Sequence, residues 1–176
     1  LLQLIDDILD LSKIEAGTME FTLAPTDIND LMEGIYRQMQ EKNTSPDVAI
    51  TFMEKAEECI LNTDRVRLSQ VIINFTNNAM KFTPKGSIQI GYRIDEAKDE
   101  IYFYVKDTGI GIPADKINEV FERFVKLNTF AKGTGLGLAI CRVIVERLGG
   151  TIGADSKEGE GSCFWFRLPI TPKSNN

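Results

Sequence analysis

The sequence predicts an α+β fold, a two-layer sandwich in which helices cover one face of a mixed sheet. Three observations predict it. Apolar residues recur at helical spacing in several segments, strand-like segments lie between them, and two pairs of strand-like segments flank polar turns as hairpins. Helices placed between antiparallel hairpins are typical of this class. With 176 residues, the chain is long enough for one domain with a core and an appended element.

The composition is that of an ordinary globular protein, with 43% hydrophobic and 26% charged residues. The net charge of −6 and the lack of a polybasic run disfavour nucleic acid and anionic membrane surfaces as partners. No apolar stretch has the length needed to span a bilayer, and no signal peptide is visible at the start.

The spacing of the cysteines and the lack of histidine limit the catalytic and metal-binding chemistry of this chain. The three cysteines are widely spaced and form no CxxC pair, so we expect buried free thiols in a reducing compartment. The chain has no histidine at all. Ser-His-Asp and Cys-His catalysis and histidine-ligated metals are therefore excluded within it.

The first element is an amphipathic helix over residues 1–16, ended by Gly17. Its apolar stripe is wide, and the chain starts inside the pattern without a capping residue. We therefore expect a helix that continues upstream and packs in a dimer or a bundle. Residues 19–24 alternate as a short strand that Pro25 closes.

The remaining elements follow from periodicity and turn residues. A helix over 28–41 is expected after a cap at Thr26 or Asp27. Gly149 and Gly150 end the last predicted helix. The predicted strands are 48–52, 59–61, a hairpin of 87–94 with 101–107, and a closing hairpin of 151–155 with 161–168. The further predicted helices are 64–83, 115–126 and 135–148.

The helix over 64–83 carries two stripes, one apolar and one polar. Asn74, Asn77 and Asn78 lie close together in it, although asparagine weakens a helix by competing for backbone hydrogen bonds. An amide oxygen suits one position of a Mg²⁺ shell that waters and phosphates complete. A solvated polar face explains the same residues equally well, so this helix alone does not decide.

Two glycine-bearing motifs follow. DTGIGIP, at 107–113, places Asp107 at the end of a strand, where its carboxylate can accept from an exocyclic amine such as that of adenine. GTGLG, at 133–137, opens directly into a helix, so that free backbone N–H groups could cradle a phosphate. Each motif alone also fits a plain turn or hinge. Together with the asparagine helix they supply every part of a Mg–ATP site, and the polar loop 127–133 could close over it.

At these residues the chain resembles the catalytic, ATP-binding half of bacterial sensor histidine kinases, whose Bergerat (GHKL) nucleotide fold is shared with Hsp90 chaperones, type II topoisomerases and MutL proteins. QVIINFTNNAMKFT resembles the N box, DTGIGIP the G1 box, FERFVK the F box and GTGLGLAI the G2 box. LLQLIDDILDLSKIEAG resembles the end of the second dimerisation helix. The resemblance covers nearly the whole chain and divides it into a stub of that helix, 1–17, and an ATP-binding domain, 18–176.

The resemblance implies ATP and Mg²⁺ as cofactors and a role for each matching residue. Asn78 is the expected principal Mg²⁺ ligand, with Asn74 supporting metal or phosphates. Lys81 is expected to reach a phosphate, Phe82 to lie against adenine, and Asp107 to accept the adenine amine. The other implied nucleotide-site residues are Gly109, Gly111 and Ile112 of the G1 box, Phe121, Arg123 and Phe124 at the base of the lid, and Gly133, Thr134, Gly135, Leu136 and Gly137 of the G2 box.

The implied activity is transfer of the ATP γ-phosphoryl to a histidine on a dimerisation helix, for relay to a response-regulator aspartate. The chain contains no catalytic nucleophile, because that acceptor histidine is absent from it. The implied partners are the kinase's own dimerisation helices, in a homodimer, and a receiver domain. The implied location is a cytoplasmic domain of a parent anchored in the bacterial inner membrane.

A nucleotide-responsive interaction module without phosphotransfer is the alternative, and the intact boxes favour the enzyme. A serine-directed kinase on the same fold is disfavoured by LSKIEAG.

Overall fold

The computed structural model describes residues 2–123 and 135–171. Its larger sheet has five strands in the order β2-β4-β5-β7-β6, with β2 (Val48–Phe52) parallel to β4 (Gly86–Asp95). β5 (Glu100–Asp107), β7 (Gly161–Pro169) and β6 (Thr151–Lys157) continue it with antiparallel pairings. A separate two-stranded sheet pairs β1 (Ala24–Asp27) with β3 (Ile60–Thr63). The predicted mixed sheet is confirmed.

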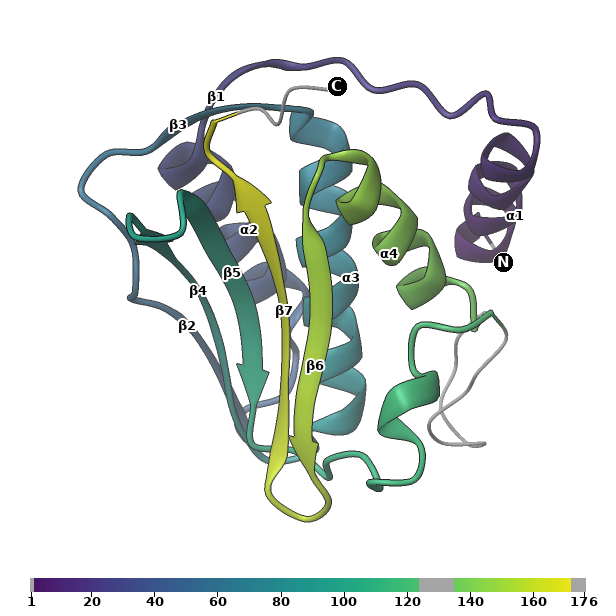
Figure 1. The fold of residues 1–176 in the computed structure, drawn as a ribbon. Coiled ribbons are helices and arrows are strands. Elements are labelled where there is room, and N and C mark those ends of the chain that lie inside the picture. The colour runs from purple at the N-terminus through teal and green to yellow at the C-terminus, as the bar shows by residue number, and fades with distance from the viewer. Residues whose placement is uncertain (1, 124–134, 172–176) are drawn as a thin grey trace.

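Helices α2 (Ile28–Lys42), α3 (Arg65–Phe82) and α4 (Gly137–Arg147) cover one face of the large sheet (Figure 1). Their apolar stripes explain this placement, since each buries its periodic apolar residues against the sheet. Asp27 caps α2 by accepting from the Asp30 N–H at 3.1 Å. Asp64 caps α3 through the Arg67 N–H at 3.0 Å. The two-layer sandwich predicted from the sequence is the observed architecture.

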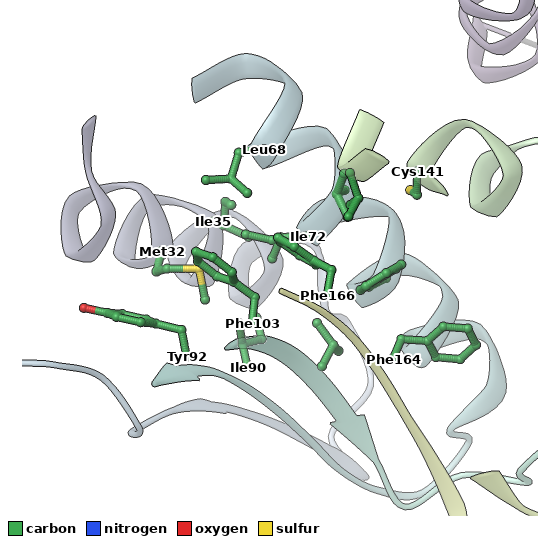
Figure 2. Close-up of a cluster of buried hydrophobic side chains, with 14 of the residues drawn as sticks. Met32, Ile35, Leu68, Ile72, Ile90, Tyr92, Phe103, Cys141, Phe164 and Phe166 are labelled. Carbon is green, nitrogen blue, oxygen red and sulfur yellow. The ribbon is translucent and has the colours of Figure 1, made fainter. Parts of the chain in front are cut away.

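The core lies between the sheet and these helices. Figure 2 shows Phe103 of β5 and Phe166 of β7 beneath Ile72 of α3, with Tyr92 and Met32 further along the same layer. The rings of Phe103 and Phe166 stack with centroids 4.7 Å apart, and both side chains are fully buried. This core fixes α3 against the strands, and with it the position of the asparagine residues.

Helix α1 (Leu2–Glu15) lies beside α4, at the edge of the sandwich (Figure 1). Its Leu11 and Ile14 pack against the core cluster, while a second row of large apolar side chains stays exposed. That row is Leu2, Leu4, Ile5, Ile8 and Leu9. No helix in the described ranges is long and apolar enough to cross a membrane.

Two predicted elements differ from the structure. Residues 19–24 were expected to form a strand closed by Pro25, but residues 18–23 are not paired and Pro25 lies inside β1. The unpaired stretch runs across helix ends, where Phe21 lies under Arg67 and Arg147, so it has no strand beside it. The predicted helix over 115–126 is a single 3₁₀ turn at Ile117–Glu119 in its described part, up to 123.

Candidate nucleotide site

Helix α3 presents its amide side chains beside the apolar stripe that anchors it. Leu68, Ile72, Phe75 and Ala79 are buried as predicted, whereas Asn74, Asn77 and Asn78 are half-buried. Asn78 Nδ2 lies 3.5 Å from Asn74 Oδ1, one helical turn away. The two amides therefore form one continuous polar face, and the core fixes the direction in which it points.

A small cavity lies between this helix and the G1 segment. Its lining includes five of the predicted site residues, and these come from two separate parts of the chain, α3 and the segment 107–113. They are Asn78, Phe82, Asp107, Gly111 and Ile112. The cavity holds about 20 Å³, close to the space of a single water molecule. An aromatic base would therefore have to move side chains aside to enter, and half-buried Phe82 and exposed Ile110 stand at its wall.

Asp107 is the buried charged group of this cavity, with 5% of its surface exposed. Its Oδ1 accepts from the Gly109 N–H at 2.9 Å and from the Ser162 N–H at 3.3 Å. Burial raises the pKa of the Asp107 carboxyl, and these two backbone donors oppose that shift. The nearby Thr83 hydroxyl also opposes the rise of this pKa. It is buried, and it forms no hydrogen bond within the part of the chain that the structure describes.

The arrangement fits a base carrying an exocyclic amine. Two backbone donors hold Oδ1, which leaves Oδ2 as the acceptor available to a ligand. The unpartnered Thr83 hydroxyl supplies a second polar group at the same place. Sequence reasoning missed Thr83 and Ser162, because Thr83 ends the N box without an assigned role and a strand N–H carries no motif of its own.

Close backbone packing explains the glycines of the G1 segment. A Cβ at Gly109 would lie 2.1 Å from the Phe82 carbonyl oxygen, and one at Gly111 would lie 2.1 Å from the Lys157 carbonyl oxygen. Gly111 also has a φ of 69°, a conformation that favours glycine. The segment can therefore press against the end of α3 and the β6–β7 turn, which brings the cavity wall to Asp107.

A larger cleft lies on the other side of the asparagine face. It holds about 600 Å³ between α1, α3 and α4, and its lining includes Asn74, Asn77 and Gly137. A Cβ at Gly137 would lie 2.3 Å from Asn74 Nδ2, so only glycine allows α4 to begin against that amide. Among residues 2–123 and 135–171, no side chain caps the start of α4, and the first backbone N–H groups of a helix have no intrahelical acceptor. The cleft thus offers the donors that a phosphate group requires.

The residues present also fit a divalent cation that arrives with phosphates. The described ranges contain no group of three or more cysteine or acidic side chains able to hold a metal ion. Any Mg²⁺ here would therefore depend on the Asn78 and Asn74 amide oxygens together with ligand oxygens and water. Lys81, one turn further along, supplies a positive charge at the same face. Partial burial and the neighbouring Lys42 lower the pKa of Lys81, and Asp7 of α1 opposes them.

The F box and G2 box are described only in part. Phe121 packs edge-on against Phe164, with ring centroids 6.2 Å apart. Arg123, predicted as a polar contact of the lid base, pairs with Glu15 of α1. Gly135 and buried Leu136 lead into α4. The predictions for Phe124, Gly133 and Thr134, and for the polar loop 127–133, lie outside the described residues.

Contacts between α1 and the site were not predicted. Asp10 accepts from Arg67 at 3.2 Å and from Gln70 at 2.7 Å, and both ends of the ion pair are largely buried. Asp7 is buried, with 3% of its surface exposed, and lines the larger cleft together with Gly137. Two acidic residues three apart, on the face that also carries Leu11 and Ile14, were the available signal.

A buried carboxylate in a small cavity, an amide face and a helix that begins without a side-chain cap among the described residues, all on one α/β sandwich, are the features of a nucleotide-binding ATPase domain. A family model described as "Histidine kinase-, DNA gyrase B-, and HSP90-like ATPase" matches residues 63–172. The chain belongs to this family. Its relatives in the family are the catalytic ATP-binding domains of sensor histidine kinases.

Individual relatives agree with this assignment. Autoinducer 2 sensor kinase/phosphatase LuxQ of Vibrio vulnificus (strain YJ016) is 37% identical over 97% of the chain, which spans 21% of that protein. A crystal structure of full-length ShkA in complex with AMPPNP superimposes with a TM-score of 0.87 at 30% identity, over 99% of this chain and 36% of that one. Histidine kinase ThkA in complex with response regulator protein TrrA gives 0.75 at 26% identity, over 93% and 47%. The chain thus spans about a fifth of the length of the curated relatives it matches.

Proposed function

We propose that this chain is the ATP-binding catalytic part of a protein-histidine kinase and delivers the γ-phosphoryl group of ATP to a histidine outside the chain. The observation that carries the proposal is the joint lining of one cavity by Asn78, Phe82 and Asp107, from two elements that the N and G1 boxes predict. The nucleotide in the ShkA complex supports ATP as the class of ligand.

Each residue has a defined part in this proposal. Asp107 accepts a hydrogen bond from the base amine, and Phe82 packs against the base. Asn78 and Asn74 supply the amide oxygens that would hold Mg²⁺, which neutralises phosphate charge when bound. Lys81 and the backbone N–H groups at Gly137 orient the phosphates. Transfer of this kind depends mainly on positioning and charge neutralisation, which suits a site without a nucleophile of its own.

The acceptor and partners are inferred from the relatives. The chain has no histidine, so the acceptor is proposed to lie on another dimerisation helix of a homodimer. We propose that residues 1–17 are the end of the second such helix and that 18–176 form the catalytic domain. A response-regulator receiver domain is the proposed next acceptor, by analogy with the ThkA–TrrA complex. That the full-length protein carries a membrane anchor stays a prediction.

A transfer assay tests the proposal. The chain is mixed with a separately produced dimerisation domain that carries the acceptor histidine, and γ-labelled ATP is added with Mg²⁺. The expected result is acid-labile, base-stable label on the dimerisation domain, abolished by replacing its histidine. Tight ATP binding without any transfer, to this acceptor or to one joined covalently to α1, would contradict the kinase proposal and favour a nucleotide-responsive interaction module.

A further inference from the structure

Lys42 reaches the asparagine face from outside the segments that carry the nucleotide motifs. It is the last residue of α2, and its Nζ donates to Asn77 Oδ1 at 2.8 Å. Asn77 in turn lines the larger cleft together with Asn74 and Gly137. A side chain of α2 is thereby tied to the end of the site at which the phosphates are proposed to lie.

Lys81 lies one helical turn after Asn77 on α3, the residue to which Lys42 donates. Burial lowers the pKa of Lys81, and the positive charge of Lys42 lowers it further. Among the described residues neither lysine forms a salt bridge with a carboxylate. Asp7 is the acidic group whose charge favours protonated Lys81. Two neighbouring cations without ion-pair partners destabilise one another, and a bound polyanion would relieve that repulsion.

We propose that Lys42 is a phosphate-binding residue of the nucleotide site, held in place by Asn77 and acting with Lys81. The inference rests on the proposed function and extends it to α2, which carries none of the nucleotide motifs. The Nζ group is a compact charge on a flexible stem with three donors. It can therefore keep its hydrogen bond to Asn77 while it turns another donor toward a phosphate oxygen.

A structural role for Lys42 gives a different set of outcomes. A lysine in the last turn of a helix interacts favourably with the helix dipole, and the bond to Asn77 ties α2 to α3. If that were its whole contribution, removing the charge would lower the thermal midpoint and leave the affinities for charged and uncharged ligands in the same ratio. A phosphate-binding role changes that ratio instead.

The test is a calorimetric titration of the full chain and of Lys42→Met with AMPPNP and with adenosine, at low and at high salt. Lys98→Met, in the turn between β4 and β5, is the matched control. We expect Lys42→Met to weaken AMPPNP binding about tenfold, the range of one hydrogen bond to a charged group. Adenosine affinity is expected to change less than twofold, the AMPPNP loss to shrink at high salt, and Lys42→Arg to restore most of the affinity.

Two outcomes would overturn the inference. One is an AMPPNP affinity of Lys42→Met within twofold of the parent, and the other is an equal loss for AMPPNP and adenosine. A parent chain that binds no nucleotide at all would overturn the proposed function and this inference with it. The parent titration is therefore read first, and it separates the two failures.

Discussion

At the scale of single residues, the proposed site contains a carboxyl group that the fold buries almost completely. Asp107 is almost inaccessible, and burial raises its pKa despite two backbone N–H donors. A chain selected for stability alone would place a neutral side chain there. The burial is explained if the group serves a ligand, since a desolvated acceptor discriminates strongly between amine donors and other groups.

The cost of burying this carboxyl predicts that the free energies of unfolding of the parent chain and of Asp107→Asn depend differently on pH. A carboxyl whose pKa is raised on folding favours the folded state in acid, and that contribution is lost as the pH rises through the raised pKa. The amide that replaces the carboxyl in the variant does not ionise. We therefore expect similar free energies of unfolding in acid and a more stable variant at neutral pH, measured by denaturant unfolding across this range. Equal pH profiles for both chains would show that the carboxyl titrates as if unburied.

Gly137 supplies a second prediction at this scale. An added Cβ would lie 2.3 Å from Asn74 Nδ2, so Gly137→Ala should displace that amide. Because Asn74 is half-buried, its side chain can turn away, and the thermal midpoint should change little. AMPPNP affinity in the presence of Mg²⁺ should fall about tenfold, as expected when one charged-group contact is lost. The readout is calorimetric titration beside thermal unfolding.

Gly34→Ala is the control for this substitution. Gly34 lies inside α2, and a Cβ there would meet nothing within 4 Å. Alanine at this position should leave nucleotide affinity unchanged and add roughly 0.5–1 kcal/mol of stability, through its better helix propensity. Unchanged affinity in Gly137→Ala would mean that Asn74 takes no part in the site.

At the scale of elements, periodicity predicted the architecture well and the ends of elements less well. The helices around residues 28–41, 64–83 and 135–148 are present because a three- or four-residue apolar spacing leaves them one way to bury a face. The strand expected at 19–24 has the alternation of a strand, but pairing needs a neighbouring strand. The spacing of apolar residues predicts which side chains are buried. It does not predict which other strand lies beside a given segment.

The same limit applies to the site. Asn78, Phe82 and Asp107 could be predicted because motifs mark them, and the structure brings them to one cavity. Ser162 and Lys42 could not, because they are joined to the site only by tertiary contacts. Thr83 ends the N box, but the pattern does not reveal that its hydroxyl is buried beside Asp107. Spacing along the chain does not encode which elements will meet.

The aromatic layer under α3 gives a prediction for this scale. Phe103 and Phe166 stack at 4.7 Å and are fully buried. Phe103→Ala should lower the free energy of unfolding by about 3–5 kcal/mol, from lost burial and the cavity left behind. Denaturant unfolding measures this directly. Ile94→Ala, at the exposed far end of β4, is the control, with an expected change below about 1 kcal/mol. A similar loss of unfolding free energy in both variants would contradict the assignment of Phe103 to the core.

At the scale of the whole molecule, α1 is joined to the elements that carry the site. Asp10 bonds to Arg67 and Gln70 of α3, and Glu15 pairs with Arg123, which lies beside Leu136 of the G2 segment. Leu11 and Ile14 add apolar contacts with the core. Any movement of α1 relative to the sandwich must therefore break contacts made by α3 itself, the helix that presents the asparagine face.

Asp10→Ala should release α1 without unfolding the sandwich. The substitution leaves Arg67 largely buried and without its carboxylate, at a cost on the order of 1–3 kcal/mol to the docked arrangement. Limited proteolysis should cut the unpaired stretch 18–23 faster than in the parent, while the core domain persists. Asp6→Ala, which removes an exposed carboxylate of α1 beside the larger cleft, is the control. Equal cleavage rates would mean that the apolar contacts alone hold α1.

The most direct test of the nucleotide site is a calorimetric titration of the chain with AMPPNP, with and without Mg²⁺, repeated on Asp107→Asn. Because two backbone donors hold Oδ1, the side-chain oxygen of asparagine would take that position in the variant. Its NH₂ group would then face the amine of the base, and two donors would meet without an acceptor. We predict binding that Mg²⁺ strengthens, and a loss of about a hundredfold in the variant, the range of an unpaired buried polar group. Binding of equal strength by the folded variant would contradict the assignment of Asp107 as the acceptor for the base.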